Sequence, residues 1–223
     1  MLYLILVDCS LLRAGERYGG LRSVRRMARR RGKSPENVIL DSSWLSPSER
    51  RLIPEKAGRP DVVHRTLLAA TDSPAFREGL VEIFMETLDG RVFGAARGLR
   101  PPRTYARFVG LMEQLLEEGE IGPPGRRLMW EIGGDLRGLI ERLSPDLVVL
   151  AWERGGLCDP ADVLDPELDA ALLVGAFAVG DFEEDVLELA DLKISIYGGS
   201  LPSSTVTSIL LWEAYRRWRG VVR

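Results

Sequence analysis

Histidine and cysteine are scarce in this sequence. Its 223 residues include one histidine, His64, and two cysteines, Cys9 and Cys158. A zinc site built from thiolates and imidazoles therefore lacks ligands within one chain, and any histidine-dependent catalysis must use His64. We predict no bound metal. With so few cysteines, we expect reduced, mostly buried thiols and a cytoplasmic protein.

Long apolar runs are also missing. No run approaches the roughly 20 residues that cross a bilayer. The apolar start at 2–7 has no basic segment before it and ends at Asp8. We therefore expect no membrane span and no secretory signal. Hydrophobic residues still make up 45% of the chain, which is enough for the core of a globular domain.

The near-neutral net charge of −3 conceals a strong asymmetry. Residues 1–107 carry 20 Lys/Arg and 12 Asp/Glu, a net of +8, whereas residues 108–223 carry 10 and 21, a net of −11. Nine basic residues fall within 13–33, against one acid, Glu16. Clustered arginine indicates a surface for a polyanion. A solvated helix face paired with acids elsewhere explains such a run equally well.

Short apolar segments alternate with helical patterns, which is typical of an α/β protein with a mainly parallel sheet. We predict strands at 2–7, 38–40, 81–84, 147–151, 171–174 and 193–197. Apolar residues at three- and four-residue spacing predict helices at 20–31, 60–70, 103–117, 126–142 and 203–218. The glycines and prolines of 90–102 predict a loop or an inserted hairpin.

A helix start at Pro60 places two charged residues together. Proline suits the first helical position, so Asp61 lies in the first turn, where free N–H groups and the helix dipole favour its ionised form. Arg59 beside it either pairs with Asp61 or reaches outward to an anion. A plain helix start with a stabilising acid is the simpler interpretation. His64 on the same helix is interpreted as structural.

Arg100, Arg103 and Arg107 form a group of arginines without a local acid. Arg103 and Arg107 lie one helical turn apart, and Arg100 comes just before them. Their mutual repulsion calls for an anion or for a carboxylate from elsewhere in the chain. Guanidinium groups suit phosphate or negative charge on a base. A solvated helix end is the alternative.

A glycine-containing turn follows the predicted strand 171–174. Gly175 and Gly180 have the spacing that begins a phosphate-binding loop, but Asp181 and Phe182 stand where that loop needs lysine and a hydroxyl residue. An acid at this place repels phosphate. The turn instead suits a cationic ligand or one without phosphate, such as S-adenosylmethionine.

A second turn of the same kind, Gly198-Gly199, follows the predicted strand 193–197. Hydroxyl residues after it are expected to cap the predicted helix 203–218. Ligands of parallel sheets bind beyond the carboxyl ends of the strands. The two turns are therefore expected to bracket one ligand.

Five motifs in order resemble those of a known family. They are Leu40-Asp-Ser-Ser43, Gly58-Arg-Pro-Asp-Val-Val-His64, Arg100-Pro-Pro-Arg103 to Arg107-Phe-Val-Gly-Leu-Met-Glu113, Val174-Gly-Ala-Phe-Ala-Val-Gly-Asp-Phe182 and Ile194-Ser-Ile-Tyr197. On these motifs the chain resembles the SPOUT-class (α/β-knot) methyltransferases that modify N1 of a pseudouridine in small-subunit ribosomal RNA. The match covers roughly residues 37–215, and the second motif is the most specific.

The resemblance implies a SPOUT-type trefoil-knotted, mainly parallel sheet flanked by helices. It implies a single domain over residues 1–223 with a family-specific insertion at roughly 41–105. The implied activity is S-adenosylmethionine-dependent methylation of the rRNA pseudouridine by a homodimer that supports ribosome biogenesis. The implied cofactor-binding residues are Gly175, Gly180, Ile196, Tyr197, Gly198, Gly199, Ser200 and Leu201. The positions matched to RNA binding are Arg59, Asp61, Arg100, Arg103 and Arg107.

We hypothesise that Asp61 orients or accepts the proton of N1, while Arg59, Arg100 or Arg103 stabilises negative charge on the ring. Two alternatives remain open. A non-catalytic RNA-binding ribosome-assembly factor needs the basic face but not the glycine turns. A small-molecule or nucleotide enzyme on a doubly wound sheet needs the turns but not the arginines. The arginine cluster at 13–33 lies outside the matched motifs.

Overall fold

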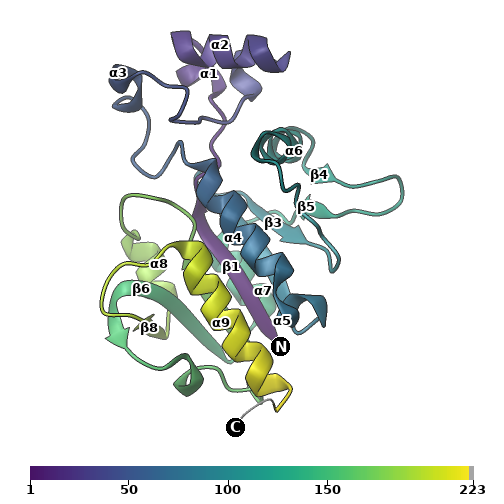
Figure 1. Ribbon diagram of the computed structural model, residues 1–223, viewed down its shortest axis with the longest axis vertical. Helices are drawn as coiled ribbons and strands as arrows, with labels where there is room; N and C mark the ends of the chain where they lie inside the picture. The colour runs from purple at the N-terminus through teal and green to yellow at the C-terminus, as the bar shows by residue number, and fades with distance from the viewer. Residues whose placement is uncertain (221–223) are drawn as a thin grey trace.

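The computed structural model describes residues 1–220, which form an eight-stranded sheet covered by helices on both faces (Figure 1). Among these residues, no helix is both long and apolar enough to cross a membrane. The elements in chain order are β1 (Leu2–Cys9), α1 (Gly15–Gly19), α2 (Arg22–Arg31), η1 (Pro35–Asn37), α3 (Pro47–Arg50), α4 (Pro60–Asp72), α5 (Pro74–Arg77), β2 (Val81–Thr87), β3 (Val92–Ala95), α6 (Tyr105–Glu118), β4 (Glu120–Ile121), β5 (Met129–Glu131), α7 (Leu136–Leu143), β6 (Leu147–Leu157), η2 (Pro160–Asp162), β7 (Ala170–Gly175), α8 (Glu184–Leu189), β8 (Leu192–Ser195) and α9 (Ser203–Trp218).

The sheet has the strand order β4-β5-β3-β2-β1-β7-β6-β8. β1 pairs in parallel with β2 and β7, and β6 pairs in parallel with β7 and β8. β3, β5 and β4 extend one edge through antiparallel pairs. The predicted α/β class with a mainly parallel sheet is confirmed. The trefoil threading implied by the resemblance stays a prediction.

Alternate residues of β1 enter two separate cores. Leu4 and Leu6 pack in the core that includes residues of α4, α6 and α9, whereas Ile5 and Val7 pack with residues of α7 and α8. Each such side chain contributes roughly 1.5–3 kcal/mol when it is fully buried. The sequence alternation therefore fixes β1 between two helical layers, and it sets which helices stand beside the carboxyl ends of the strands.

The helices α1, α2 and α3 form a small lobe beyond the N-terminal end of α4 (Figure 1). The lobe has its own core, in which Val24 and Met27 of α2 pack with Val38, Leu40 and Leu45. We refer to residues 13–58 as the basic lobe. Its last segment, residues 41–58, leads directly into α4.

Two predicted elements are wrong. Residues 38–40 form no strand: Ile39 makes only one bridge, with Arg13, because its neighbours fill the core of the basic lobe. The predicted helix 126–142 divides into β5 and α7. The break lies at Gly133-Gly134, after which Asp135 caps α7 by accepting the N–H of Gly138. The segment 90–102, expected to be a loop or an inserted hairpin, supplies one strand of a hairpin, β3, which pairs antiparallel with the preceding β2, and it continues as a loop.

Candidate active site

A cleft of about 530 Å³ opens at the carboxyl ends of β7 and β8. Its lining includes Ala151, Val174 and Ile194, which the strand register places side by side. The turns after β7 and β8 and the N-terminal ends of α4 and α9 form the walls. This is where a parallel sheet binds its ligand, and the volume falls in the range of small-molecule sites.

Most of the residues predicted to bind the cofactor meet in this cleft. The lining includes Gly175, Gly180, Ile196, Tyr197, Gly199, Ser200 and Leu201; Gly198 is not among the lining residues. The two turns come from strands that are separated by β6 in the sheet. Both turns therefore border one cleft, and the expectation that they bracket one ligand stays a prediction.

The first turn depends on glycine at two positions. A Cβ atom on Gly175 would lie 2.8 Å from the rings of both Phe177 and Phe182. Those rings pack edge to face with their centroids 5.4 Å apart, so a Cβ atom at Gly175 would have to displace both of them or the turn itself. Gly180 has φ of +102°, which L side chains rarely adopt. The shape of this wall is thus set by close approach and by backbone conformation.

Asp181 gives the cleft a fixed negative charge. Its carboxylate accepts a hydrogen bond from Nε1 of Trp152 at 2.7 Å and pairs with Arg154 at 2.9 Å. Burial acts to raise the pKa of Asp181, but the hydrogen bonds from Phe182 N–H and Trp152 and the charge of Arg154 outweigh it, so the pKa is lowered. The ionised form is therefore favoured at neutral pH, which suits a cationic ligand.

Lys56 supports the same turn from the basic lobe, a role that the sequence analysis missed. Its ammonium lies 2.8 Å from Asp8 and 5.1 Å from the ring centroid of Phe177. Both partners are distant in the sequence, and no local pattern marks a lone lysine as part of such a contact.

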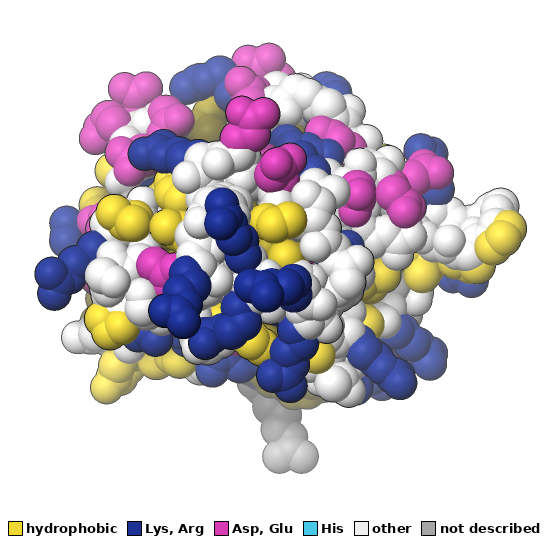
Figure 2. All heavy atoms as spheres, turned by 90° about the horizontal axis from the view of Figure 1, so that it is seen from above, with side chains coloured by type: hydrophobic (Ala, Val, Ile, Leu, Met, Phe, Trp, Pro, Cys, Tyr) yellow, Lys and Arg dark blue, Asp and Glu magenta, His cyan; other side chains and the backbone are white. Residues whose placement is uncertain are grey.

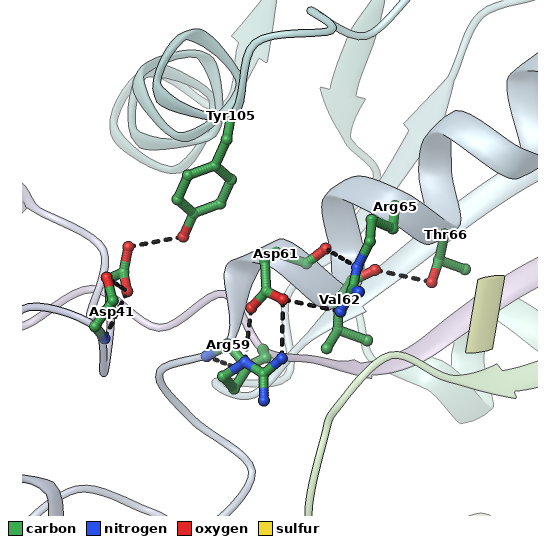
Figure 3. Close-up of polar contacts among 9 residues, drawn as sticks. Asp41, Arg59, Asp61, Val62, Arg65, Thr66 and Tyr105 are labelled. Atoms are coloured by element: carbon green, nitrogen blue, oxygen red, sulfur yellow. Dashed lines mark hydrogen bonds and ion pairs between the residues drawn. The ribbon is translucent and has the colours of Figure 1, made fainter. Parts of the chain in front are cut away.

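Arg59 and Asp61 form a bidentate pair at the mouth of the cleft (Figure 3). Nε of Arg59 donates to Oδ1 of Asp61 at 2.7 Å, and its terminal nitrogen donates to Oδ2 at 2.9 Å. Arg65, one turn later on α4, donates to Oδ2 at 2.9 Å. Arg59 and Arg65 line the cleft. Of the two options for Arg59, the structure has the pair with Asp61.

The pair changes the chemistry available to Asp61. The hydrogen bond from Arg59 is the main cause that lowers the pKa of Asp61; burial opposes it, and the charges of Arg59 and Arg65 add to it. A carboxylate with a lowered pKa and both oxygens engaged is a weak proton acceptor. Its geometry instead suits a group that holds Arg59 in place.

Comparisons with known proteins agree with this geometry. The family model described as EMG1/NEP1 methyltransferase matches residues 4–214. The chain belongs to the EMG1/NEP1 methyltransferase family. The family recognised from the motifs is thus confirmed.

Two curated relatives of this chain carry the name ribosomal RNA small subunit methyltransferase Nep1. The one from Archaeoglobus fulgidus is 38% identical over 97% of this chain and 96% of its own length. The one from Thermococcus kodakarensis is 35% identical over 93% and 94%. A crystal structure of Archaeoglobus fulgidus Nep1 bound to S-adenosylhomocysteine superposes with a TM-score of 0.86 at 36% identity, covering 98% of both chains.

The second group of predicted arginines lies away from this cleft. Arg103 donates to both carboxylate oxygens of Asp72, the last residue of α4, at 2.6 and 2.8 Å. Asp72 is thus the carboxylate that the local sequence lacked. Arg100 and Arg103 border a second cleft, and Arg107 is exposed on α6. Because α4 has 13 residues, roughly 20 Å separates its two ends. One chain alone therefore does not bring Arg59 and Arg103 together.

The Leu40-Asp-Ser-Ser43 motif does not line the cleft; it contacts α6 beside it. Asp41 is buried, accepts hydrogen bonds from the backbone and hydroxyl of Ser43, and accepts one from the hydroxyl of Tyr105 at 2.7 Å (Figure 3). Burial, followed by the hydrogen bond to Asp41, raises the pKa of Tyr105. The pair ties residues 41–58 to α6.

His64 has a structural environment. His64 is 6% exposed, its Nε2 contacts the carbonyl oxygen of Pro102 at 2.7 Å, and its ring stacks on Phe108. The structural role is confirmed.

The expected hydroxyl cap of α9 is wrong: Pro202 occupies the cap position and has no side-chain acceptor, so the backbone N–H of Thr205 bonds to its carbonyl oxygen instead.

Glu86, at the end of β2, carries a testable pH dependence. Burial, followed by the charge of Asp8, raises its pKa from 4.5 to about 7, and its Oε2 is buried without a hydrogen-bond partner. Between pH 4.5 and about 7 the folded protein keeps a proton that the unfolded chain has lost. The free energy of unfolding therefore falls as pH rises through this window, by up to about 3 kcal/mol.

We expect Glu86→Gln to remove this fall. In urea unfolding, the variant should match the wild type at pH 4 and exceed it at pH 8, by up to about 3 kcal/mol. An equal difference at both pH values would show that the amide acts through packing and not through ionisation.

Proposed function

We propose that this chain is an S-adenosylmethionine-dependent methyltransferase that modifies N1 of a pseudouridine in small-subunit ribosomal RNA and so supports ribosome biogenesis. The observation that carries the proposal is that Arg59, from the most specific family motif, borders the same cleft as both glycine turns. The names of the relatives and the S-adenosylhomocysteine in the neighbouring structure support it. A non-catalytic assembly factor has no need for such a cleft.

The residues of the cleft fit a sulfonium cofactor. Asp181 supplies a fixed anion, Tyr197 supplies an exposed aromatic ring, and the two turns present main-chain groups where side chains are absent. Gly175 and Gly180 keep the first turn in a shape that a Cβ atom would disturb. When bound, S-adenosylmethionine supplies an activated methyl group, so the protein has to position the acceptor and manage one proton.

Arg59 is the group best placed to act on the acceptor base. Its guanidinium is held by the bidentate pair with Asp61 and stands at the mouth of the cleft, where it can stabilise negative charge that develops on the ring as N1 loses its proton. Asp61 orients Arg59 through this pair. Holding N1 in line with the methyl group is worth about 7 kcal/mol or more in well-oriented reactions.

We also propose that the protein is a homodimer located in the cytoplasm. The guanidinium of Arg103 lies about one helix length from Arg59 in a single chain, because it pairs with Asp72 at the far end of α4. A partner subunit offers a way to place that second group beside the cleft, and Arg100, Arg103 and Arg107 then extend the RNA-binding surface.

Two measurements test the proposed function. Calorimetry should show the purified protein binding S-adenosylmethionine. Methyl transfer should then occur to an RNA stem-loop that contains pseudouridine and not to the same stem-loop with uridine, because N1 of uridine carries the glycosidic bond. Donor binding without transfer to the pseudouridine RNA would favour the assembly-factor alternative. Equal transfer to both RNAs would overturn the assignment of N1.

A further inference from the structure

The arginine cluster at 13–33 forms an exposed stripe on α2 that the proposed site does not use. The inner face of α2 is buried through Val24 and Met27 in the core of the basic lobe. Figure 2 looks down on this end of the molecule and shows Lys and Arg side chains gathered over the lobe. The exposed arginines of α2 are Arg22, Arg25, Arg26, Arg29 and Arg30.

These arginines fall into two groups. Arg26 donates to the carbonyl oxygen of Trp44 at 3.2 Å, and Arg30 lies over the Trp44 ring at 5.2 Å, so both help to hold the lobe together. Within residues 1–220, the side chains of Arg22, Arg25 and Arg29 take part in no hydrogen bond, ion pair or ring contact. Their spacing of three and four residues places them on one stripe of the helix.

Glu49, which contacts the first turn of α2, is already engaged in hydrogen bonds. Glu49 accepts the backbone N–H groups of Ser23 and Ser46 and the hydroxyl of Ser46, and these hydrogen bonds lower its pKa to about 2. It therefore caps α2 and α3 and forms no salt bridge to the stripe. The free guanidinium groups repel one another in the isolated protein, so an external anion stabilises them.

The stripe lies at the same end of the molecule as the candidate active site. Trp44 belongs to the segment 41–58, whose Ser42 N–H donates to the carbonyl oxygen of Gly58 at 2.9 Å, next to Arg59. Lys56 of this segment reaches Phe177 in the cleft. The basic lobe therefore lies beside the cleft. An RNA whose target base is at Arg59 passes the lobe when its backbone leaves the cleft toward residues 41–58.

We propose that Arg22, Arg25 and Arg29 bind the phosphate backbone of the substrate RNA outside the target loop. The inference rests on the proposed function for the identity of the RNA. The three residues span about 10 Å of helix, which corresponds to about three phosphates of one strand. Guanidinium groups bind phosphate through two parallel hydrogen bonds.

RNA suits this surface better than a protein partner does. Protein interfaces have an apolar or aromatic centre, whereas Leu52 is the sole large hydrophobic residue exposed in the described basic lobe, and it lies outside α2. A stripe of charge without an apolar centre is typical of backbone recognition, which depends on charge and carries no sequence information.

The test compares two triple variants of the full-length protein. Arg22→Gln, Arg25→Gln and Arg29→Gln together neutralise the stripe. Arg126→Gln, Arg127→Gln and Arg137→Gln remove the same charge from exposed residues outside both clefts. For each variant, affinity for the pseudouridine stem-loop is measured from low to high salt. Affinity for an oligonucleotide that contains only the loop is measured in parallel.

For the stripe variant we expect about tenfold or more weaker binding of the stem-loop near 0.1 M salt, and a salt slope that is smaller by about 2 to 3. Binding of the isolated loop and of S-adenosylmethionine should not change, and the KM for RNA should rise with kcat retained. An unchanged salt slope overturns the proposal and leaves an acidic protein as the occupant. An equal loss in the control variant overturns it in favour of net charge. Failure of the proposed function is distinguishable, since then the wild type itself transfers no methyl group.

Discussion

Gly175→Ala is expected to weaken binding of S-adenosylmethionine by about 100-fold, because its new Cβ atom has no room. The atom would stand 2.8 Å from two aromatic rings that already pack against each other. Relief requires these rings, which line the cleft, or the turn after β7 to shift, and overpacking of this kind costs about 1–3 kcal/mol. Because the turn forms a wall of the cleft, the shift changes the shape of the donor site. Calorimetric titration of the donor measures the effect directly.

Gly110→Ala is the matched control. Gly110 lies inside α6, and no heavy atom outside the helix lies within 4 Å of the Cβ that alanine would add. Alanine at this helical position should raise the free energy of unfolding by about 0.5–1 kcal/mol and leave donor affinity as it is. Full donor affinity in a folded Gly175→Ala protein would show that the turn does not shape the site.

The site could be predicted from the sequence where it depends on the ends of strands and the start of a helix. Gly175 and Gly199 follow apolar segments, and parallel strands present their carboxyl ends at one edge of a sheet. Pro60 marks the first turn of α4, so the place of Asp61 follows from local chemistry. These features depend on residues that are close together in the chain.

The features that escaped prediction depend on distant contacts. The partner of Arg103 is Asp72, 31 residues earlier, and the partner of Lys56 is Asp8, 48 residues earlier. Residues 38–40 have the composition of a strand, yet they fill the core of the basic lobe. Their burial there outweighs intrinsic β propensity, which is a weak preference. Within one chain Arg103 pairs with Asp72 and does not reach Arg59.

Arg59→Ala is expected to lower kcat/KM for methyl transfer by about 100- to 1,000-fold, which is the usual loss when one preorganised charge-stabilising donor is removed. Affinity for S-adenosylmethionine should change little, because the turns after β7 and β8 remain intact. Arg59→Lys should restore little activity, since an ammonium group does not reproduce the bidentate pair with Asp61. Single-turnover rates at saturating donor and RNA separate this loss from weaker binding.

Two further variants decide what the Arg59 result means. Arg91 makes a similar bidentate pair, to Glu131 of β5, and it lines neither cleft, so Arg91→Ala should retain turnover. Asp61→Asn keeps one amide oxygen for Arg59, and a positioning role predicts a loss of only about tenfold, with a rate that still rises as higher pH helps N1 lose its proton. A loss in Asp61→Asn as large as that in Arg59→Ala, with no rise at high pH, would instead make Asp61 the proton acceptor. The proposed role of Arg59 depends on its guanidinium, which Asp61 holds at the mouth of the cleft. Full activity in Arg59→Ala would therefore show that Arg59 takes no part in the chemistry.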